Sequence, residues 1–468
     1  MLTMLIPERS GASRAGPEEL GGNHGAGNIL AKVFETLDGA GVPYCVLHGY
    51  ENYPDQIGSD VDCLIDRNVS ASELLALFQA NKGRIGGEVV RCRGYHLVLA
   101  GTGDDGWPCF LNLDLSVDCE LDDVAFYDGA EVLPSRRRHG QFWIPAAEFD
   151  FGCYLVRSVA KRRLDDARAL RLSRLFEQDP ARCERQIARF WRGRSAEILV
   201  AALQSGDWSQ AREHLDALRA ELLRRAASRG AGRFAAKKLR GFFGRIKRLC
   251  RPEGVDVVLL GPDGAGKSSL VEALGPALSG AFPRWTCQGF APPILGRLRR
   301  PNSRTDQPHG LPARSFLASV LRANYWLAFH TFGYPKLHLA LARSNLVLND
   351  RHFVDILVDA KRYRYGGPAW LLHLIWRVIP KPDLIVLLDA PAEVLQARKQ
   401  EVPFEVTARQ RMAYLSLVLT LPNGHVVDAA QSRELVARVV SDIVLRHLAA
   451  RIAGCHGVEQ DVGRPSAS

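Results

Sequence analysis

The stretch "VDVVLLGPDGAGKSSLVEAL", Val255 to Leu274, changes from apolar to glycine-rich to amphipathic over a short length of chain. Its apolar run from Val257 to Leu260 has the composition of a buried parallel strand, and the glycines that follow end that strand. After the glycines, apolar residues recur at the spacing of one helix face. They are Leu270, Val271, Leu274 and Leu278. The stretch therefore predicts a strand, a tight loop and a helix in direct succession.

The loop matches the pattern GxxxxGK[ST], which is typical of phosphate binding. Glycines let backbone N–H groups curl inward around an anion, and the N-terminus of the next helix adds the positive end of its dipole. We expect Lys267 to reach the terminal phosphates and Ser268 to offer its hydroxyl group to Mg²⁺. A purely structural glycine turn is the alternative. The predicted nucleotide-binding residues are Gly261, Asp263, Gly264, Ala265, Gly266, Lys267, Ser268 and Ser269.

A second motif, "LVLNDRHFVD", places Asp350 and Arg351 at the end of a predicted strand, Leu346 to Leu348. At such a position a carboxylate can orient Mg²⁺, and a guanidinium group can hold an acceptor phosphate through two hydrogen bonds. We therefore predict Asp350 as a metal ligand and both residues as catalytic. The alternative is a solvated ion pair at a strand end.

A later strand, Leu384 to Leu388, ends at Asp389 and is followed by a turn and a helix from Ala390 to Arg398. Strands that alternate with helices predict an α/β fold with a doubly wound parallel sheet, in which ligands bind at the carboxyl ends of the strands. This fold would place Asp350, Asp389 and the phosphate-binding loop on one rim.

Through "GPDGAGKSS", "NDRH", "RYRYGG" and "PDLIVLLDAPAEVLQARK", the chain from Val255 to about Leu448 resembles the thymidylate kinase family of P-loop kinases. The resemblance implies ATP and Mg²⁺ as cofactors. It also implies that Asp263 contacts the sugar of the acceptor and that Asp350 and Arg351 set the metal and the acceptor phosphate.

The same resemblance implies that arginines of a mobile lid close over the donor, with Arg398 as a catalytic residue and Arg409 as a second candidate. Other cations that could serve there are Arg362, Arg364 and Lys399. The sequence departs from the family at His352, where the family has tyrosine. It departs again in the segment 284–314, which is rich in proline and arginine. The acceptor therefore stays open between a nucleoside monophosphate and a sugar monophosphate.

The N-terminal part contains "YCVLHGYENYPDQIGSDVDCLID", in which Gly49 follows one predicted strand and Asp60 and Asp62 belong to a second. Alternate residues of a strand point to the same side, so both carboxylates can face one pair of Mg²⁺ ions. Asp114, in "FLNLDLSVD" on a later strand, supplies a third candidate ligand.

This spacing of a glycine and three carboxylates resembles the nucleotidyltransferase superfamily, over about Ala31 to Asp118. The resemblance implies binding of a metal–triphosphate and transfer of a nucleotidyl group. The usual small residue after the glycine is Tyr50 here. A structural or degenerate site is the alternative. The helical segment that follows carries Lys161, either near a phosphate or on a solvated helix face.

The net charge of +10 is concentrated in one place, because the segment between Glu221 and Glu253 holds many Lys and Arg residues and no acid. A general nucleic-acid surface is therefore not expected. In "GRFAAKKLRGFFGRIKRLCR", Gly232 to Arg251, apolar residues can gather on one side of a helix with cations beside them. Such a helix can lie on an anionic membrane. An interdomain helix that buries the same residues is the alternative.

We expect an N-terminal α+β nucleotidyltransferase-like domain with a helical extension and a C-terminal P-loop domain. The predicted division is a disordered N-terminus 1–26, the nucleotidyltransferase-like domain 27–145, the helical extension 146–230, a basic amphipathic linker helix 231–252, the thymidylate-kinase-like P-loop domain 253–453 and a loose tail 454–468. The ten cysteines are scattered without a metal-binding spacing, which indicates reduced thiols in a cytoplasmic protein.

These patterns predict an enzyme with two active sites, a thymidylate-kinase-like phosphotransferase and a nucleotidyltransferase-like domain whose own activity is left open. By resemblance, such a fusion suggests envelope or exopolysaccharide biosynthesis. An enzyme in which only the kinase is active is one alternative. Another is a non-catalytic adaptor, gated by nucleotide, at the inner surface of the membrane. The oligomeric state cannot be inferred from the sequence.

Overall fold

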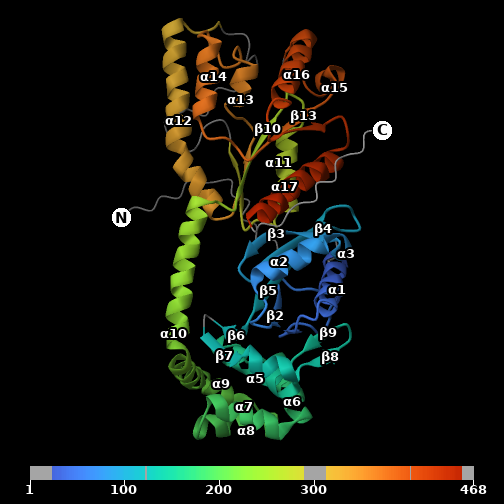
Figure 1. The fold of residues 1–468 in the computed structure, drawn as a ribbon, viewed down its shortest axis with the longest axis vertical. Coiled ribbons are helices and arrows are strands. Elements are labelled where there is room, and N and C mark those ends of the chain that lie inside the picture. The colour runs from blue at the N-terminus through green and yellow to red at the C-terminus, as the bar shows by residue number, and fades with distance from the viewer. Residues whose placement is uncertain (1–23, 122–123, 289–311, 401, 456–468) are drawn as a thin grey trace. The chain divides into compact units, whose positions relative to one another are not determined.

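The computed structural model describes residues 24–121, 124–288, 312–400 and 402–455. It divides into two compact units, shown together in Figure 1. Of the described residues, the N-terminal unit comprises 24–105, 109–244 and 448–455, and the P-loop unit comprises 106–108 and 245–447, each without the gaps given above. Each unit has its own sheet and is described by itself.

The N-terminal unit contains a sheet with the strand order β1-β2-β5-β4-β3. Its elements are α1 (His24–Gly39), β1 (Tyr44–Val46), β2 (Val61–Ile65), α2 (Ala71–Ala80), α3 (Lys82–Ile85), β3 (Gly87–Arg93), β4 (His96–Thr102) and β5 (Pro108–Ser116). Strands β2 and β5 are parallel, and their register places Asp62 directly opposite Asp114. The predicted strands are present, whereas β3 was not predicted. Helix α1 begins inside the segment predicted to be disordered, because Ala26, Ile29 and Leu30 are buried in the core.

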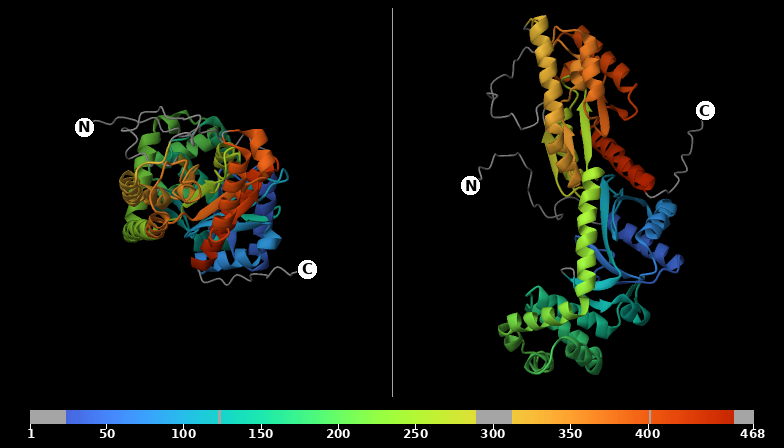
Figure 2. Two further views of the ribbon diagram at one scale, coloured as in Figure 1. Left: turned by 90° about the horizontal axis from the view of Figure 1, so that it is seen from above. Right: turned by 60° about the vertical axis from the view of Figure 1, so that its left-hand side comes forward.

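The rest of the N-terminal unit consists of two short ribbons and a group of helices. Its elements are β6 (Asp118–Leu121), β7 (Val124–Asp128), α4 (Gly129–Val132), a 3₁₀ turn (Leu133–Ser135), β8 (Arg137–His139), β9 (Phe142–Ile144), α5 (Ala147–Ala160), α6 (Asp166–Gln178), α7 (Pro180–Phe190), α8 (Arg194–Ser205), α9 (Ser209–Glu213) and α10 (Leu215–Cys250). Helix α10 runs without a break through the boundary that we predicted between the helical extension and the linker helix. The two predicted segments therefore share one long helix, whose later part is seen along its length in the right-hand view of Figure 2.

The P-loop unit contains a parallel sheet with the strand order β11-β12-β10-β13-β14. Its elements are β10 (Val255–Leu260), α11 (Lys267–Ala277), β11 (Trp285–Gln288), α12 (Phe316–Ala342), β12 (Leu346–Asn349), α13 (Val354–Val358), α14 (Ala369–Val378), β13 (Leu384–Asp389), α15 (Ala392–Arg398), α16 (Phe404–Val418), β14 (Gly424–Asp428) and α17 (Arg433–Cys455). All neighbouring strands are parallel, so their carboxyl ends meet at one edge. The predicted alternation of strands and helices is confirmed.

Apolar side chains hold the helices against this sheet. Val258 and Leu260 of β10 and Ile385 of β13 belong to one cluster with Tyr414 and Val418 of α16. In Figure 1, α12, α13 and α14 lie to the left of β10 and β13, and α15 and α16 lie to the right. Because all six residues of β10 are buried, the strand that leads into the phosphate-binding loop is fixed in the core.

One carboxylate is buried within this core. Asp256 of β10 accepts a hydrogen bond from Nδ2 of Asn349 at 2.5 Å, and its backbone N–H donates to the carboxylate of Asp383 at 2.8 Å. Burial, together with the negative charge of Asp383, raises the pKa of Asp256 to about 7. The folded protein therefore keeps a proton on Asp256 that the unfolded chain releases near pH 4.

We expect folding stability to fall as the pH rises from about 4 to about 7, because over this range the unfolded chain has lost the proton of Asp256 and the folded protein still holds it. Asp256→Asn removes this cost, and its amide oxygen can still accept the hydrogen bond from Asn349. The variant should be more stable than the wild type by on the order of 2–4 kcal/mol at pH 8, and this difference should shrink toward pH 4. Urea unfolding at several pH values measures it. A difference that does not change with pH would contradict the assignment.

Candidate nucleotide site and candidate metal centre

The phosphate-binding loop depends on glycines in the left-handed region of backbone conformation. Gly261, Gly264 and Gly266 have φ angles of 145°, 85° and 90°. At Gly264, a Cβ atom would lie 2.8 Å from the carbonyl oxygen of Leu395 in α15. The loop therefore packs closely against α15, and residues with a side chain would be strained at these positions.

Lys267, the first residue of α11, lies inside the curve of the loop. Its Nζ donates hydrogen bonds to the carbonyl oxygens of Gly261 at 2.6 Å and Pro262 at 3.0 Å. Burial lowers the pKa of Lys267, and the carboxylates of Asp355 and Asp263 oppose this shift. The arrangement holds a cation where phosphate groups would lie.

Ser268 and Asp350 come together at the carboxyl edge of the sheet. The hydroxyl group of Ser268 lies 3.5 Å from Oδ2 of Asp350. They meet because β10 and β12 pair in parallel, with Val258 opposite Asn349, so the residues after each strand start from the same edge. A hydroxyl and a carboxylate are the oxygen ligands that Mg²⁺ prefers, so this pair fits the predicted metal.

Arg351 and Arg362 occupy the segments that follow β12 and α13. Arg351 lies near the phenol group of Tyr363, whose pKa is raised by burial, and the positive charge of Arg351 opposes this shift. Arg362 forms an ion pair with Asp263 of the loop, and both side chains are mostly buried. The contact of Asp263 with the sugar of the acceptor stays a prediction, and its ion pair with Arg362 was not predicted.

Two further carboxylates of this region were missed by the sequence analysis. Asp355 is buried, and it accepts hydrogen bonds from the backbone N–H of His352 at 2.8 Å and from the hydroxyl of Tyr414 at 2.7 Å. Asp359 accepts a hydrogen bond from the side chain of Gln410 at 2.7 Å. Both lie on "FVDILVD", where their spacing of one helical turn after the Asp-Arg motif was a usable signal.

His352 lies in the apolar core rather than at the rim. Its ring centroid is 5.2 Å from that of His330 and 5.9 Å from that of Trp376. Burial, aided by the charges of His330 and Lys381, lowers the pKa of His352 to about 3, so the ring is neutral near pH 7. The departure from tyrosine at this position is therefore accommodated by packing.

The two arginines predicted to form a lid lie in different settings, and a third arginine lies near them. Arg398, the last residue of α15, donates a hydrogen bond to the carbonyl oxygen of Ala429 at 2.8 Å. Arg409 is exposed on α16. Arg411, which the sequence analysis did not single out, makes two hydrogen bonds to Asp389, at 2.7 and 2.8 Å. This pair fixes α16 to the end of β13, so Asp389 serves as an anchor at the rim.

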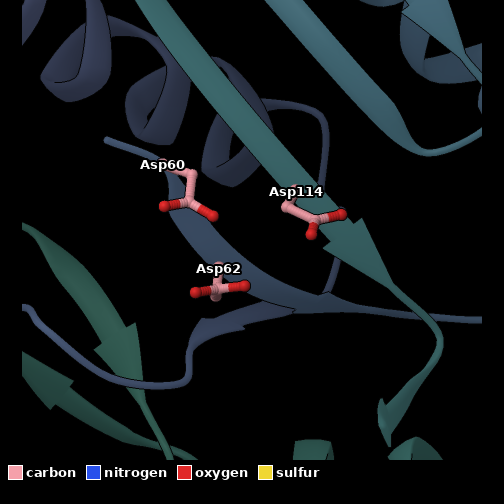
Figure 3. A group of neighbouring side chains, drawn as sticks. All are labelled: Asp60, Asp62 and Asp114. Atoms are coloured by element: carbon pink, nitrogen blue, oxygen red, sulfur yellow. The ribbon is translucent and has the colours of Figure 1, made fainter. Parts of the chain in front are cut away.

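The N-terminal unit brings Asp60, Asp62 and Asp114 together (Figure 3). Each offers a carboxylate oxygen, and these oxygens all lie within 4.8 Å of one another. Asp62 and Asp114 face each other across the parallel pair β2–β5, and Asp60 directly precedes β2. Asp60 and Asp114 are exposed and Asp62 is half-buried, so a cation from solvent can reach all three.

Basic side chains lie beside Asp62 and lower its pKa. Nε2 of His48 lies 2.8 Å from Oδ2 of Asp62, and Nη1 of Arg157 lies 3.4 Å from Nδ1 of the same imidazole. Burial would raise the pKa of Asp62, but the hydrogen bond from His48 and the charges of Arg157 and Lys161 outweigh it and lower that pKa. Asp62 is therefore ionised near pH 7, as a metal ligand must be.

Tyr50 replaces the small residue expected after Gly49, and the structure explains how it fits. Gly49 has a φ of 75°, which turns the chain away from the strand direction. Tyr50 is buried, its hydroxyl group donates to Asp150 of α5, and the guanidinium of Arg171 lies 5.5 Å from its ring centroid. Its side chain therefore ties this loop to the helical extension.

The P-loop unit thus combines a parallel sheet, a glycine loop closed on Lys267, and a hydroxyl–carboxylate pair, which together define the class of P-loop phosphotransferases. The chain belongs to the thymidylate kinase family. The thymidylate kinase of Oenococcus oeni is 30% identical over 218 residues, which cover 40% of this chain and 92% of that protein. The thymidylate kinase of Xanthomonas oryzae pv. oryzae is 29% identical over 226 residues, 46% of this chain and 92% of that protein.

The comparisons with family models and with solved structures give less information about this chain. No protein-family model matches the chain. The solved structure of thymidylate kinase from Candida albicans is 16% identical and aligns with 42% of this chain and 93% of that chain, with a TM-score of 0.31, which is too low to inform the fold. Among the described residues, no helix is long and apolar enough to cross a membrane. The family relationship covers less than half of the chain, so the nucleotidyltransferase-like resemblance of the N-terminal unit stays a prediction.

We expect the Asp60–Asp62–Asp114 cluster to bind Mn²⁺ or Mg²⁺ without nucleotide, because three carboxylate oxygens converge there. Asp114→Asn should weaken Mn²⁺ binding by about tenfold or more, since one charged ligand is lost. Titration of the full chain with Mn²⁺, followed by electron paramagnetic resonance, measures the free ion. Asp55→Asn, at an exposed aspartate outside the cluster, is the control and should bind as the wild type does. Equal affinities for Asp114→Asn and the wild type would exclude the cluster as a metal centre.

Proposed function

We propose that the P-loop unit transfers the γ-phosphate of ATP to a monophosphate acceptor and yields ADP and a diphosphate. The observation that carries this proposal is the position of Lys267 inside the loop, with Ser268 and Asp350 beside it at the carboxyl edge of the sheet. The family relationship supports a kinase-type transferase. Catalysis of this kind rests on positioning and on stabilising charge, which these groups can supply.

Each group has a distinct role in the proposed transfer. An oxygen of the acceptor phosphate attacks the γ-phosphorus, and the bond from that phosphorus to the β,γ-bridging oxygen breaks. Lys267 exchanges its two carbonyl partners for oxygens of the β- and γ-phosphates. Arg351, next to Tyr363, holds the acceptor phosphate. Ser268 and Asp350 would hold Mg²⁺, which neutralises charge on the phosphates.

The acceptor is proposed to be a nucleoside or sugar monophosphate. Thymidine monophosphate is the first to test, because the relatives are thymidylate kinases. The Asp263–Arg362 ion pair and the carboxylate of Asp359 lie in the segments where the acceptor would bind. These groups would meet hydroxyl groups of a sugar ring, and Arg362 would also be available to a phosphate.

Lys267→Ala should lower kcat by roughly 100-fold or more, because it removes a fixed cation from the transferring phosphates. Arg351→Ala should instead impair use of the acceptor and leave ATP binding nearly unchanged. A coupled assay of ADP formation with a panel of nucleoside and sugar monophosphates measures turnover, and calorimetry measures Mg-ATP binding. Arg446→Ala, at an exposed arginine of α17, is the matched control. Binding of Mg-ATP without ADP formation from any acceptor would contradict the kinase and favour the nucleotide-gated adaptor.

We also propose a second activity, metal-dependent nucleotidyl transfer by the N-terminal unit. The specific observation in its favour is the convergence of Asp60, Asp62 and Asp114 beside the basic side chains of His48 and Arg157. In such a reaction an acceptor oxygen attacks the α-phosphorus of a nucleoside triphosphate, and the bond to the pyrophosphate breaks. The three carboxylates would hold the metal, and the basic side chains would face the phosphates.

Asp60→Asn should reduce metal-dependent release of pyrophosphate from nucleoside triphosphates by roughly 100-fold, because a metal ligand is lost. The assay uses the full chain with the Lys267→Ala substitution, so that the P-loop site does not consume ATP. The second site is independent of that substitution and should keep its rate. Asp55→Asn serves again as control. If Asp60→Asn releases pyrophosphate as fast as its parent, the N-terminal unit has no such activity at this cluster.

A further inference from the structure

Helix α12 of the P-loop unit exposes a line of large apolar side chains. Leu317, Leu321, Tyr325, Phe332 and Leu339 are between 47% and 77% exposed. Their spacing of about one or two helical turns places them on one side of the helix. The opposite side is buried through Ala323, Trp326 and Phe329. Helix α12 therefore has two apolar faces. One packs in the core, and the other is exposed.

The neighbouring helix α14 has the same construction. Trp370, Leu374 and Val378 are 65%, 49% and 62% exposed, whereas Leu372 and Ile375 are buried. The buried residues share a cluster with Trp326 of α12, and the two helices lie side by side in Figure 1. Single exposed apolar residues are common on soluble proteins, but exposed apolar lines on two adjacent helices indicate an interaction surface.

The charges around these helices are of one sign. No aspartate or glutamate occurs from residue 312 to residue 349 or from residue 360 to residue 382. The exposed cations of these segments are Arg314, Lys336, Arg343, Lys361, Arg377 and Lys381. A surface that combines exposed Leu, Phe and Trp with Lys and Arg, and has no acid, is complementary to an anionic membrane surface.

The end of α10 also exposes apolar and basic side chains, and it contacts the C-terminal half of α12. Ile246 and Leu249 are 41% and 45% exposed, and the flanking Lys247 and Arg251 add positive charge. Nε2 of His338 in α12 lies 2.5 Å from the carbonyl oxygen of Leu249, so the two segments are in contact.

We propose that the outer surface of α12 and α14 docks on an anionic lipid bilayer, with the apolar side chains among the acyl chains and the cations at the headgroups. A second copy of the chain is a poorer occupant, because two surfaces that carry only cations would repel each other. A nucleic acid is also a poorer occupant, because the exposed lines contain several aliphatic side chains that cannot stack on bases. The proposal goes beyond the kinase activity and does not depend on it.

The test is flotation of the full chain with vesicles of phosphatidylcholine alone or with roughly a third of phosphatidylglycerol. The wild type should float with the anionic vesicles, and less so as salt is added. Leu321→Glu/Phe332→Glu should weaken this binding by about tenfold or more, since two apolar contacts become charged. Lys336→Ala/Arg377→Ala, which keeps the apolar residues, should lower binding to anionic vesicles by about tenfold and lessen the salt dependence.

The matched control is Met412→Glu/Leu419→Glu, which charges one residue of α16 and the residue directly after it, 62% and 74% exposed in the same unit. It should bind vesicles as the wild type does, and all variants should bind Mg-ATP normally by calorimetry. Failure of the wild type to float, or equal loss in the control, would overturn the proposal. A wild type that is a dimer by sedimentation velocity, becomes a monomer with Phe332→Glu and ignores vesicles would overturn it in favour of a second copy.

Discussion

The parallel pairing of β10 with β12 is the constraint on which the P-loop site depends. It sets Val258 opposite Asn349, so that the chain leaves both strands at the same edge, one entering the glycine loop and the other the Asp-Arg motif. Every residue of both strands is buried, which holds this pair of strands in the core. This register brings the hydroxyl group of Ser268 to 3.5 Å from the carboxylate of Asp350.

In the N-terminal unit, a pair of parallel strands also brings acidic side chains together. Its parallel pair β2–β5 sets Asp62 opposite Asp114, and the residue before β2 completes the cluster of carboxylates. The negative charges of such a cluster repel one another, and Asp62 is stabilised by the side chains of His48, from a loop, and Arg157, from α5. In both units, therefore, parallel strands far apart in the sequence place acidic groups at one edge of the sheet.

The sequence was sufficient to predict those strands, loops and helices that depend on neighbouring residues alone. The strand, loop and helix around Gly261 to Ser268 follow one another directly, and the strands ending at Asn349 and Asp389 have the composition of buried parallel strands. The partners of individual side chains could not be predicted, because they come from distant segments. The ion pair between Asp263 and Arg362 is an example, as is the anchoring of Asp389 by Arg411.

Strands β11 and β14 at the two edges of the P-loop sheet were not predicted, because they lack the continuous apolar run of the equally short, buried β12.

The cations near the phosphate-binding loop differ in how they are held. Lys267 is inside the loop and Arg362 is held by Asp263, so two positive charges are fixed close to the loop before any lid movement. Arg411 is committed to Asp389, and a bidentate pair of this kind is unavailable to phosphates unless α16 moves away from β13. In this structure, therefore, Lys267 and Arg362 are the cations held at the loop, and Arg411 holds α16 against the end of β13.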